Sequence, residues 1–135
     1  MKHIKIYEKY KQPDEVGLKK LLSHITKMLT EFGFGYSFFL DYGDYETEFT
    51  DSVENATFYV RVSPRSNMLT VKKLDRNSDV VDFIPEYFKS IRGLKYINKD
   101  HFSYIFNIVG NVDKIISQIS KEDFDFKLES KKYNI

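Results

Sequence analysis

A chain of 135 residues is long enough for one domain with its own core, and 41% hydrophobic residues are too many for intrinsic disorder. The absence of cysteine excludes disulfides, thiolate nucleophiles and cysteine-ligated zinc, and the apolar runs are too short to span a membrane. The formal net charge of +1 is far from the basic balance of most nucleic-acid-binding domains. We therefore expect one soluble, cytoplasmic domain over residues 1–135, with 129–135 as a frayed tail.

The N-terminal third predicts a short strand followed by a long helix. Ile4 and Ile6 alternate with polar residues, which indicates a strand with one buried face. Residues 11–15 carry the proline and carboxylates that favour a helix start, and Gly33 is a typical helix stop. Between them the apolar residues follow helical spacing: Leu18, Leu21, Leu22, Ile25, Met28, Leu29 and Phe32.

An aromatic hairpin is predicted next, from a strand over 34–42 with a period of two and a return strand over 45–50. A two-residue turn at Gly43-Asp44 would set the register. The pairs on one face would then be Tyr42 with Tyr45, Leu40 with Thr47 and Phe38 with Phe49. The other face would carry Phe39 opposite Glu48 and Asp41 opposite Glu46. Two opposed carboxylates cost stability, so the last pair calls for a nearby cation, full solvation or a binding role.

The remaining elements complete an α+β fold. Strands over 56–62 and 69–73 extend the hairpin to a four-stranded meander over 34–74. A helix follows over 80–91, capped by Ser78 or Asp82, and Pro85 favours the later start. A second hairpin over 94–109 should bury Phe102, Tyr104, Phe106 and Ile108. Asn111 caps a further helix over 112–119, and Phe124, Phe126 and Leu128 suggest a last strand. We expect a mostly antiparallel sheet with about three helices on one face.

Charge is distributed unevenly along this chain. Residues 32–60 include six acidic side chains and no basic one, so their formal charge is −6, whereas the other residues sum to +7. An acidic and aromatic hairpin of this kind favours a surface for a basic partner, because complementary potentials steer association. The predicted partner-binding residues are Phe39, Asp41, Asp44, Tyr45, Glu46, Glu48, Asp51 and Glu54. The alternative is a solvated face, or one that Arg61, Lys72 or Lys73 neutralises within the fold.

Motifs for catalysis, metals or cofactors are weak, and we expect none of the three. The carboxylates of the hairpin lack the spacing of a calcium loop, and the three histidines are far apart in sequence. Asp100-His101 is the one candidate acid–base pair, yet a hairpin turn beside a surface histidine explains it equally well. No glycine-rich loop leads from a strand into a helix as a phosphate site requires.

Nucleic-acid binding would depend on the basic stretch 61–99, where nine basic residues face four acidic ones. Tyr59, Tyr87 and Tyr96 would supply stacking faces there. The near-neutral total charge disfavours this direct binding.

Taken as a whole, the sequence predicts a non-enzymatic inhibitor that binds a protein with a basic functional surface. The specific form we expect is an immunity protein that blocks a nuclease toxin with carboxylates and aromatic side chains. A phage-encoded inhibitor of a host nucleic-acid-targeting enzyme would use the same physics. A nucleic-acid-binding module built on 61–99 and a small enzyme around Asp100-His101 are the competing classes.

Overall fold

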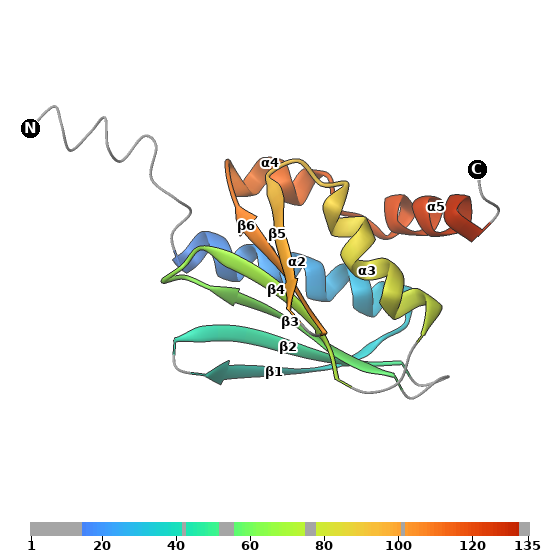
Figure 1. Ribbon diagram of the computed structural model, residues 1–135, viewed down its shortest axis with the longest axis horizontal. Coiled ribbons are helices and arrows are strands. Elements are labelled where there is room, and N and C mark those ends of the chain that lie inside the picture. Colours follow the sequence, from blue (N-terminus) through green and yellow to red (C-terminus); the bar gives the residue numbers. More distant parts are fainter. Residues whose placement is uncertain (1–14, 42, 52–55, 75–77, 101, 133–135) are drawn as a thin grey trace, which may run out of the picture.

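The computed structural model describes residues 15–41, 43–51, 56–74, 78–100 and 102–132 (Figure 1). The strand expected around Ile4 and Ile6 lies outside these residues, as does most of the helix start expected at 11–15.

The first described helix is α2 (Glu15–Phe32), and it forms where the apolar spacing predicts it. Its buried side chains, each at most 2% exposed, are Leu18, Leu21, Leu22, Ile25, Met28 and Leu29. The helix ends because Gly33, with φ of +133°, turns the chain away while its N–H donates to the carbonyl of Leu29 at 3.1 Å. The predicted helix is confirmed, and so is its buried stripe from Leu18 to Leu29, whereas Phe32 at the end of the stripe is half-buried.

Six strands form one antiparallel sheet in the order β1-β2-β3-β4-β6-β5 (Figure 1). Their bounds are β1 (Gly35–Asp41), β2 (Asp44–Thr50), β3 (Thr57–Ser63), β4 (Met68–Lys73), β5 (Leu94–Asp100) and β6 (Ser103–Ile108). The first four strands are the predicted meander, and β6 pairs with β4, which places β5 at one edge of the described sheet and β1 at the other.

The described helices lie on one side of this sheet, which we call the inner face (Figure 1). α2 and α3 (Asp79–Lys89) pack on the strands, while α4 (Val112–Ser117) and α5 (Lys121–Lys132) pack against α2 and α3. One hydrophobic core joins the helices to the inward side chains of the strands. The outer face, formed by the alternate side chains of the same strands, has no described helix over it. The predicted α+β class and one-sided helical layer are confirmed.

The last element differs from the prediction, because residues 124–128 form part of α5 and not a strand. Phe124 and Leu128 are buried, whereas Phe126 is 71% exposed. A strand would have placed all three on one face, but positions 124 and 128 are also one helical turn apart. Ser120 accepts from the N–H of Asp123 through its hydroxyl, and α5 continues to Lys132 through residues that were expected to fray.

Two smaller predictions also fail. α3 starts at the Ser78 cap, whose hydroxyl accepts from the N–H of Val81 at 3.4 Å, so Pro85 lies inside the helix. Pro85 is buried there, and packing outweighs its local cost. In the second hairpin Phe106 and Ile108 are buried as expected and Tyr104 is half-buried, but Phe102, which precedes β6, is 62% exposed.

Candidate partner-binding face

The β1–β2 hairpin forms the sheet edge at which the predicted binding residues lie. Its observed register pairs Asp41 with Asp44, Leu40 with Tyr45, Phe39 with Glu46, Phe38 with Thr47 and Ser37 with Glu48. The predicted pairing of Asp41 with Glu46 is therefore wrong by two residues. Gly43 has φ of +86°, a conformation that favours glycine, so the turn closes before Asp44 and this residue begins β2.

A shift of two residues keeps every side chain on its predicted face, because strands have a period of two. Glu46 and Glu48 alternate with the buried Tyr45, Thr47 and Phe49 along β2, so the two carboxylates lie on the outer face. Phe39, opposite Glu46, is 46% exposed. Asp44 continues the acidic series at the start of the strand. The structure thus brings four of the predicted residues together: Phe39, Asp44, Glu46 and Glu48.

The other predicted residues are placed differently. Tyr45 lies on the inner face at 8% exposure, and its hydroxyl donates to Glu15. This hydrogen bond, together with burial and the negative charge of Glu15, raises the pKa of Tyr45. Asp51 follows the end of β2, half-buried, and its N–H donates to the carbonyl of Ala56 at 2.8 Å. Glu54 and the side chain of Asp41 lie outside the described part of the chain.

Arg61 neutralises one carboxylate of this face within the fold. It lies opposite Glu46 on β3, and its Nε and Nη2 donate to Oε1 of Glu46 at 3.0 and 2.7 Å. Burial of Arg61 favours a lower pKa, but the hydrogen bond and the charges of Glu46 and Asp44 outweigh it and raise the pKa. The guanidinium also lies 4.9 Å from the ring centre of Tyr59. The predicted alternative of neutralisation by Arg61 therefore applies to Glu46.

Asp44 and Glu48 differ from Glu46 in this respect. Within the described residues neither forms a salt bridge, although Asp44 is close enough to contribute to the pKa of Arg61. Glu48 is instead flanked across the strands by Ser37 and Tyr59. Both acids therefore keep a charge that the described part of the fold does not pair directly.

The charge of the outer face changes sign across the sheet. β2 is acidic, β3 supplies Arg61, and Lys72 on β4 lies opposite Tyr59. On β5 Lys95 is opposite Asn107, which faces Met68 on the same outer side. On this face the acidic side chains of β2 therefore lie toward one edge of the described sheet, and Lys72 and Lys95 lie toward the other.

Stacking sites for nucleic acid are fewer than the sequence suggested. Tyr87 is 1% exposed, and its hydroxyl donates to Asp123 at 3.0 Å, so its ring is unavailable. Tyr96 is half-buried beneath the ammonium of Lys89, which lies 4.4 Å from the ring centre. Tyr59 is the one of the three that remains on the outer face. Lys73 pairs with Asp82 at 2.6 Å, which removes it from the basic surface.

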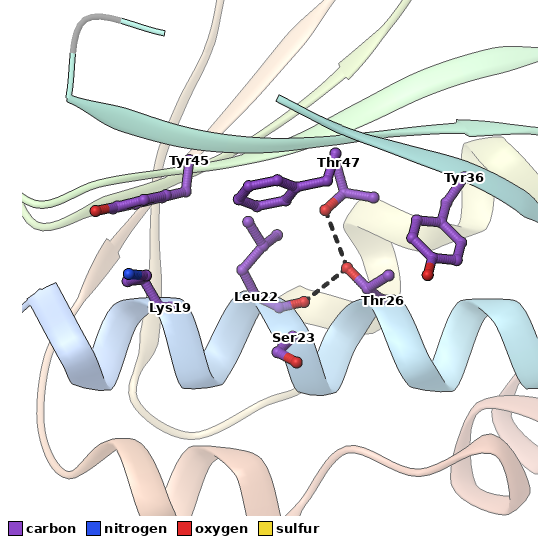
Figure 2. Close-up of a pocket in the computed structure, with 8 residues that line it drawn as sticks. Lys19, Leu22, Ser23, Thr26, Tyr36, Tyr45 and Thr47 are labelled. Carbon is purple, nitrogen blue, oxygen red and sulfur yellow. Dashed lines mark hydrogen bonds between the residues drawn. The ribbon is translucent and has the colours of Figure 1, made fainter. Parts of the chain in front are cut away.

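A groove on the inner side of the hairpin was not anticipated from the sequence. It has a volume of about 340 Å³ between α2 and the two strands, and its lining is Lys19, Leu22, Ser23, Thr26, Tyr36, Phe38, Tyr45 and Thr47 (Figure 2). Figure 2 shows Tyr45 and Lys19 facing each other at one end and Tyr36 at the other. Tyr36 and Phe38 are each 56% exposed, so α2 leaves the inner side of β1 largely uncovered.

Two threonines fix the floor of this groove. Thr26 donates to the carbonyl of Leu22 at 2.8 Å, and its hydroxyl lies 3.0 Å from that of Thr47 (Figure 2). Because the proton of Thr26 is already used, Thr47 is the donor in the second bond. Thr47 is 1% exposed, so this bond satisfies a buried hydroxyl and ties α2 to β2.

Comparison with known proteins places the chain in no group. No family model matches it, and neither the curated proteins nor the solved structures include a match. Among the described helices, none has the length and apolar character needed to cross a membrane.

Proposed function

We propose that this protein is a binding inhibitor that docks its outer β1–β2 face on a basic functional surface of another protein. The observation that supports this most is the placement of Phe39, Asp44 and Glu48 on a sheet face that no described helix covers. An exposed aromatic ring beside charged carboxylates supplies both contact area and charge complementarity.

The acids suit recognition better than stability. Glu46 is held by Arg61, but Asp44 and Glu48 stand on the same strand face without such a partner among the described side chains. Like charges along one strand face raise the energy of the free protein, and a basic partner would relieve this repulsion on binding. The basic side of the same face, with Lys72 and Lys95, would orient the partner by repelling a wrong approach.

The specific form we propose is an immunity protein for a nuclease toxin. A nuclease binds the phosphates of its substrate with a basic cleft, so a row of carboxylates can occupy that cleft without any chemistry of its own. A phage-encoded inhibitor of a host nucleic-acid-targeting enzyme shares this physics, and the identity of the captured enzyme distinguishes the two.

The test is capture from the native host followed by an activity assay. We expect the wild-type protein to retain one enzyme and to inhibit it at one-to-one stoichiometry. The double variant Asp44→Asn/Glu48→Gln should bind and inhibit it more weakly. A matched control, Glu86→Gln/Glu129→Gln, removes two charges from helix surfaces and should act like wild type. Equal effects of the two double variants, or a captured protein whose activity is unchanged, would contradict the proposal.

A further inference from the structure

The two edges of the described sheet differ in how they are protected. β5 has a bulge between Tyr96 and Asn98 and carries Lys95 and Lys99, which are the usual devices against pairing with another strand. β1 has no bulge, no lysine and no proline, and its register with β2 is continuous from Gly35 to Asp41. The backbone edge of β1 that faces away from β2 therefore favours the addition of a further strand.

The side chains of β1 are also unusually apolar for an edge. Tyr36, Phe38 and Leu40 on the inner side are 56%, 56% and 65% exposed, and Phe39 on the outer side is 46% exposed. Single exposed apolar residues are ordinary, but a run of this kind on an unprotected strand marks an interaction surface. The groove beside α2 continues this apolar strip (Figure 2).

We propose that a second copy of this chain occupies the edge, with two β1 strands paired antiparallel about Phe38. This register overlaps all seven residues and sets Phe38 opposite Phe38 of the second copy, with Tyr36 opposite its Leu40. Because antiparallel pairing about a central residue keeps each face continuous, the inner apolar residues of one copy meet those of the other. Aromatic and branched pairs of this type stabilise neighbouring strands.

Charge selects this arrangement over the parallel one. Asp41 is the one charged residue of β1, and in this register it lies opposite Gly35 of the second copy. The two Asp41 positions are then about 20 Å apart along the strands, at roughly 3.4 Å per residue. Parallel pairing in register would instead place the two carboxylates side by side, at a cost in stability.

The acidic β2 strands tolerate the same arrangement. They lie three strand spacings apart across the new seam, roughly 14 Å, which exceeds the screening length of about 8 Å at physiological ionic strength. Added salt screens the residual repulsion between these strands, so it should tighten the dimer, whereas it should weaken binding to a basic partner. Because the β5 edge is protected, assembly stops at two copies with twelve described strands in one sheet, six from each. The outer acidic faces remain open on both.

The absence of cysteine allows a direct test by single-cysteine scanning. With Phe38→Cys the two thiols lie on opposed residues, within reach of a disulfide, so mild oxidation should give a covalent dimer. Tyr36→Cys and Leu40→Cys each place the paired thiols about 14 Å apart and should not crosslink alone, but an equimolar mixture of them should. Ile97→Cys, at the other edge, serves as the matched control and should give no covalent dimer on oxidation.

Light scattering gives the independent readout. Wild type should have twice the 16.0 kDa mass of the chain, Phe38→Lys should be monomeric, and Ile97→Lys should stay dimeric. Phe38 is already more than half exposed, so its variant folds, which circular dichroism checks. A monomeric wild type would overturn the proposal. In that monomer, protection from exchange of the β1 amides that do not pair with β2 would assign the edge to another segment of the chain. Fast exchange of the same amides would leave the edge for a different protein. Crosslinking of Ile97→Cys, or growth beyond two copies, would overturn it as well.

Discussion

Replacing Glu46 with Gln tests whether this acid of the outer face stabilises the fold, unlike the neighbouring Glu48. The substitution preserves the shape of the side chain but removes the charge that accepts two hydrogen bonds from Arg61 at 3.0 and 2.7 Å. Fully exposed ion pairs contribute about 0.2–1 kcal/mol, and hydrogen bonds to charged groups about 1.5–3 kcal/mol. The side chains of Arg61 and Glu46 are 30% and 13% exposed, so the pair lies between these limits. We expect Glu46→Gln to lower the free energy of unfolding by about 1 kcal/mol.

Urea unfolding followed by circular dichroism measures this difference, since a constant slope with a lower midpoint reports stability alone. Glu48→Gln is the matched control, because it removes the same charge from the same face of the same strand. We expect it to change stability by less than about 0.5 kcal/mol, or to raise it slightly. If Glu48→Gln destabilised the protein and Glu46→Gln did not, the assignment of structural and recognition acids would be refuted.

Three further outcomes follow from the fold. Ile25 is 0% exposed, so Ile25→Ala should lower the free energy of unfolding in urea by about 2–5 kcal/mol. Val16 is 73% exposed, so Val16→Ala should lower it by less than about 0.5 kcal/mol. Equal losses would refute the packing of α2. Burial, and after it the hydrogen bond to Asp123, raises the pKa of Tyr87, so the folded state should keep its stability below about pH 10, the ordinary pKa of tyrosine, and lose stability above it. Tyr87→Phe should make this loss at high pH smaller. An unchanged pH profile would refute Tyr87 as its cause. Fluorescence anisotropy should show only weak nucleic-acid binding, in the range of about 10⁻⁴–10⁻⁶ M at physiological salt. Tight, sequence-dependent binding would favour a nucleic-acid-binding module over an inhibitor.

Local periodicity accounts for what the sequence predicted well. The stripe of α2 and the alternation of β1 and β2 are both local patterns, and a two-residue error in the turn did not move any side chain to the other face. Periodicity does not distinguish the two elements at Phe124 and Leu128, because residues four apart fit a strand face and a helix face alike. There the Ser120 cap and the i, i+4 pair of Lys121 with Asp125 decide for the helix.

Only part of the candidate face could be predicted from local sequence patterns. Composition located the acids, but the pairing of Glu46 with Arg61 depends on the register between β2 and β3. Tyr45 is among the predicted binding residues because it follows Asp44 at the hairpin tip, although the alternation along β2 places its side chain on the inner face. That β1 is an edge, and that α2 leaves Tyr36 and Phe38 exposed, follows from strand order and helix position, which no local pattern specifies.

The rate of association with the captured enzyme tests most directly whether Asp44 and Glu48 serve recognition. Stopped-flow mixing at increasing salt should show that wild-type association is fast at low salt and slows steeply as salt is added. Asp44→Asn/Glu48→Gln should associate more slowly at low salt, with a flatter salt dependence, while Glu86→Gln/Glu129→Gln should match wild type. An Asp44→Asn/Glu48→Gln variant with the wild-type association rate at every salt concentration would contradict a role of these two acids in recognition.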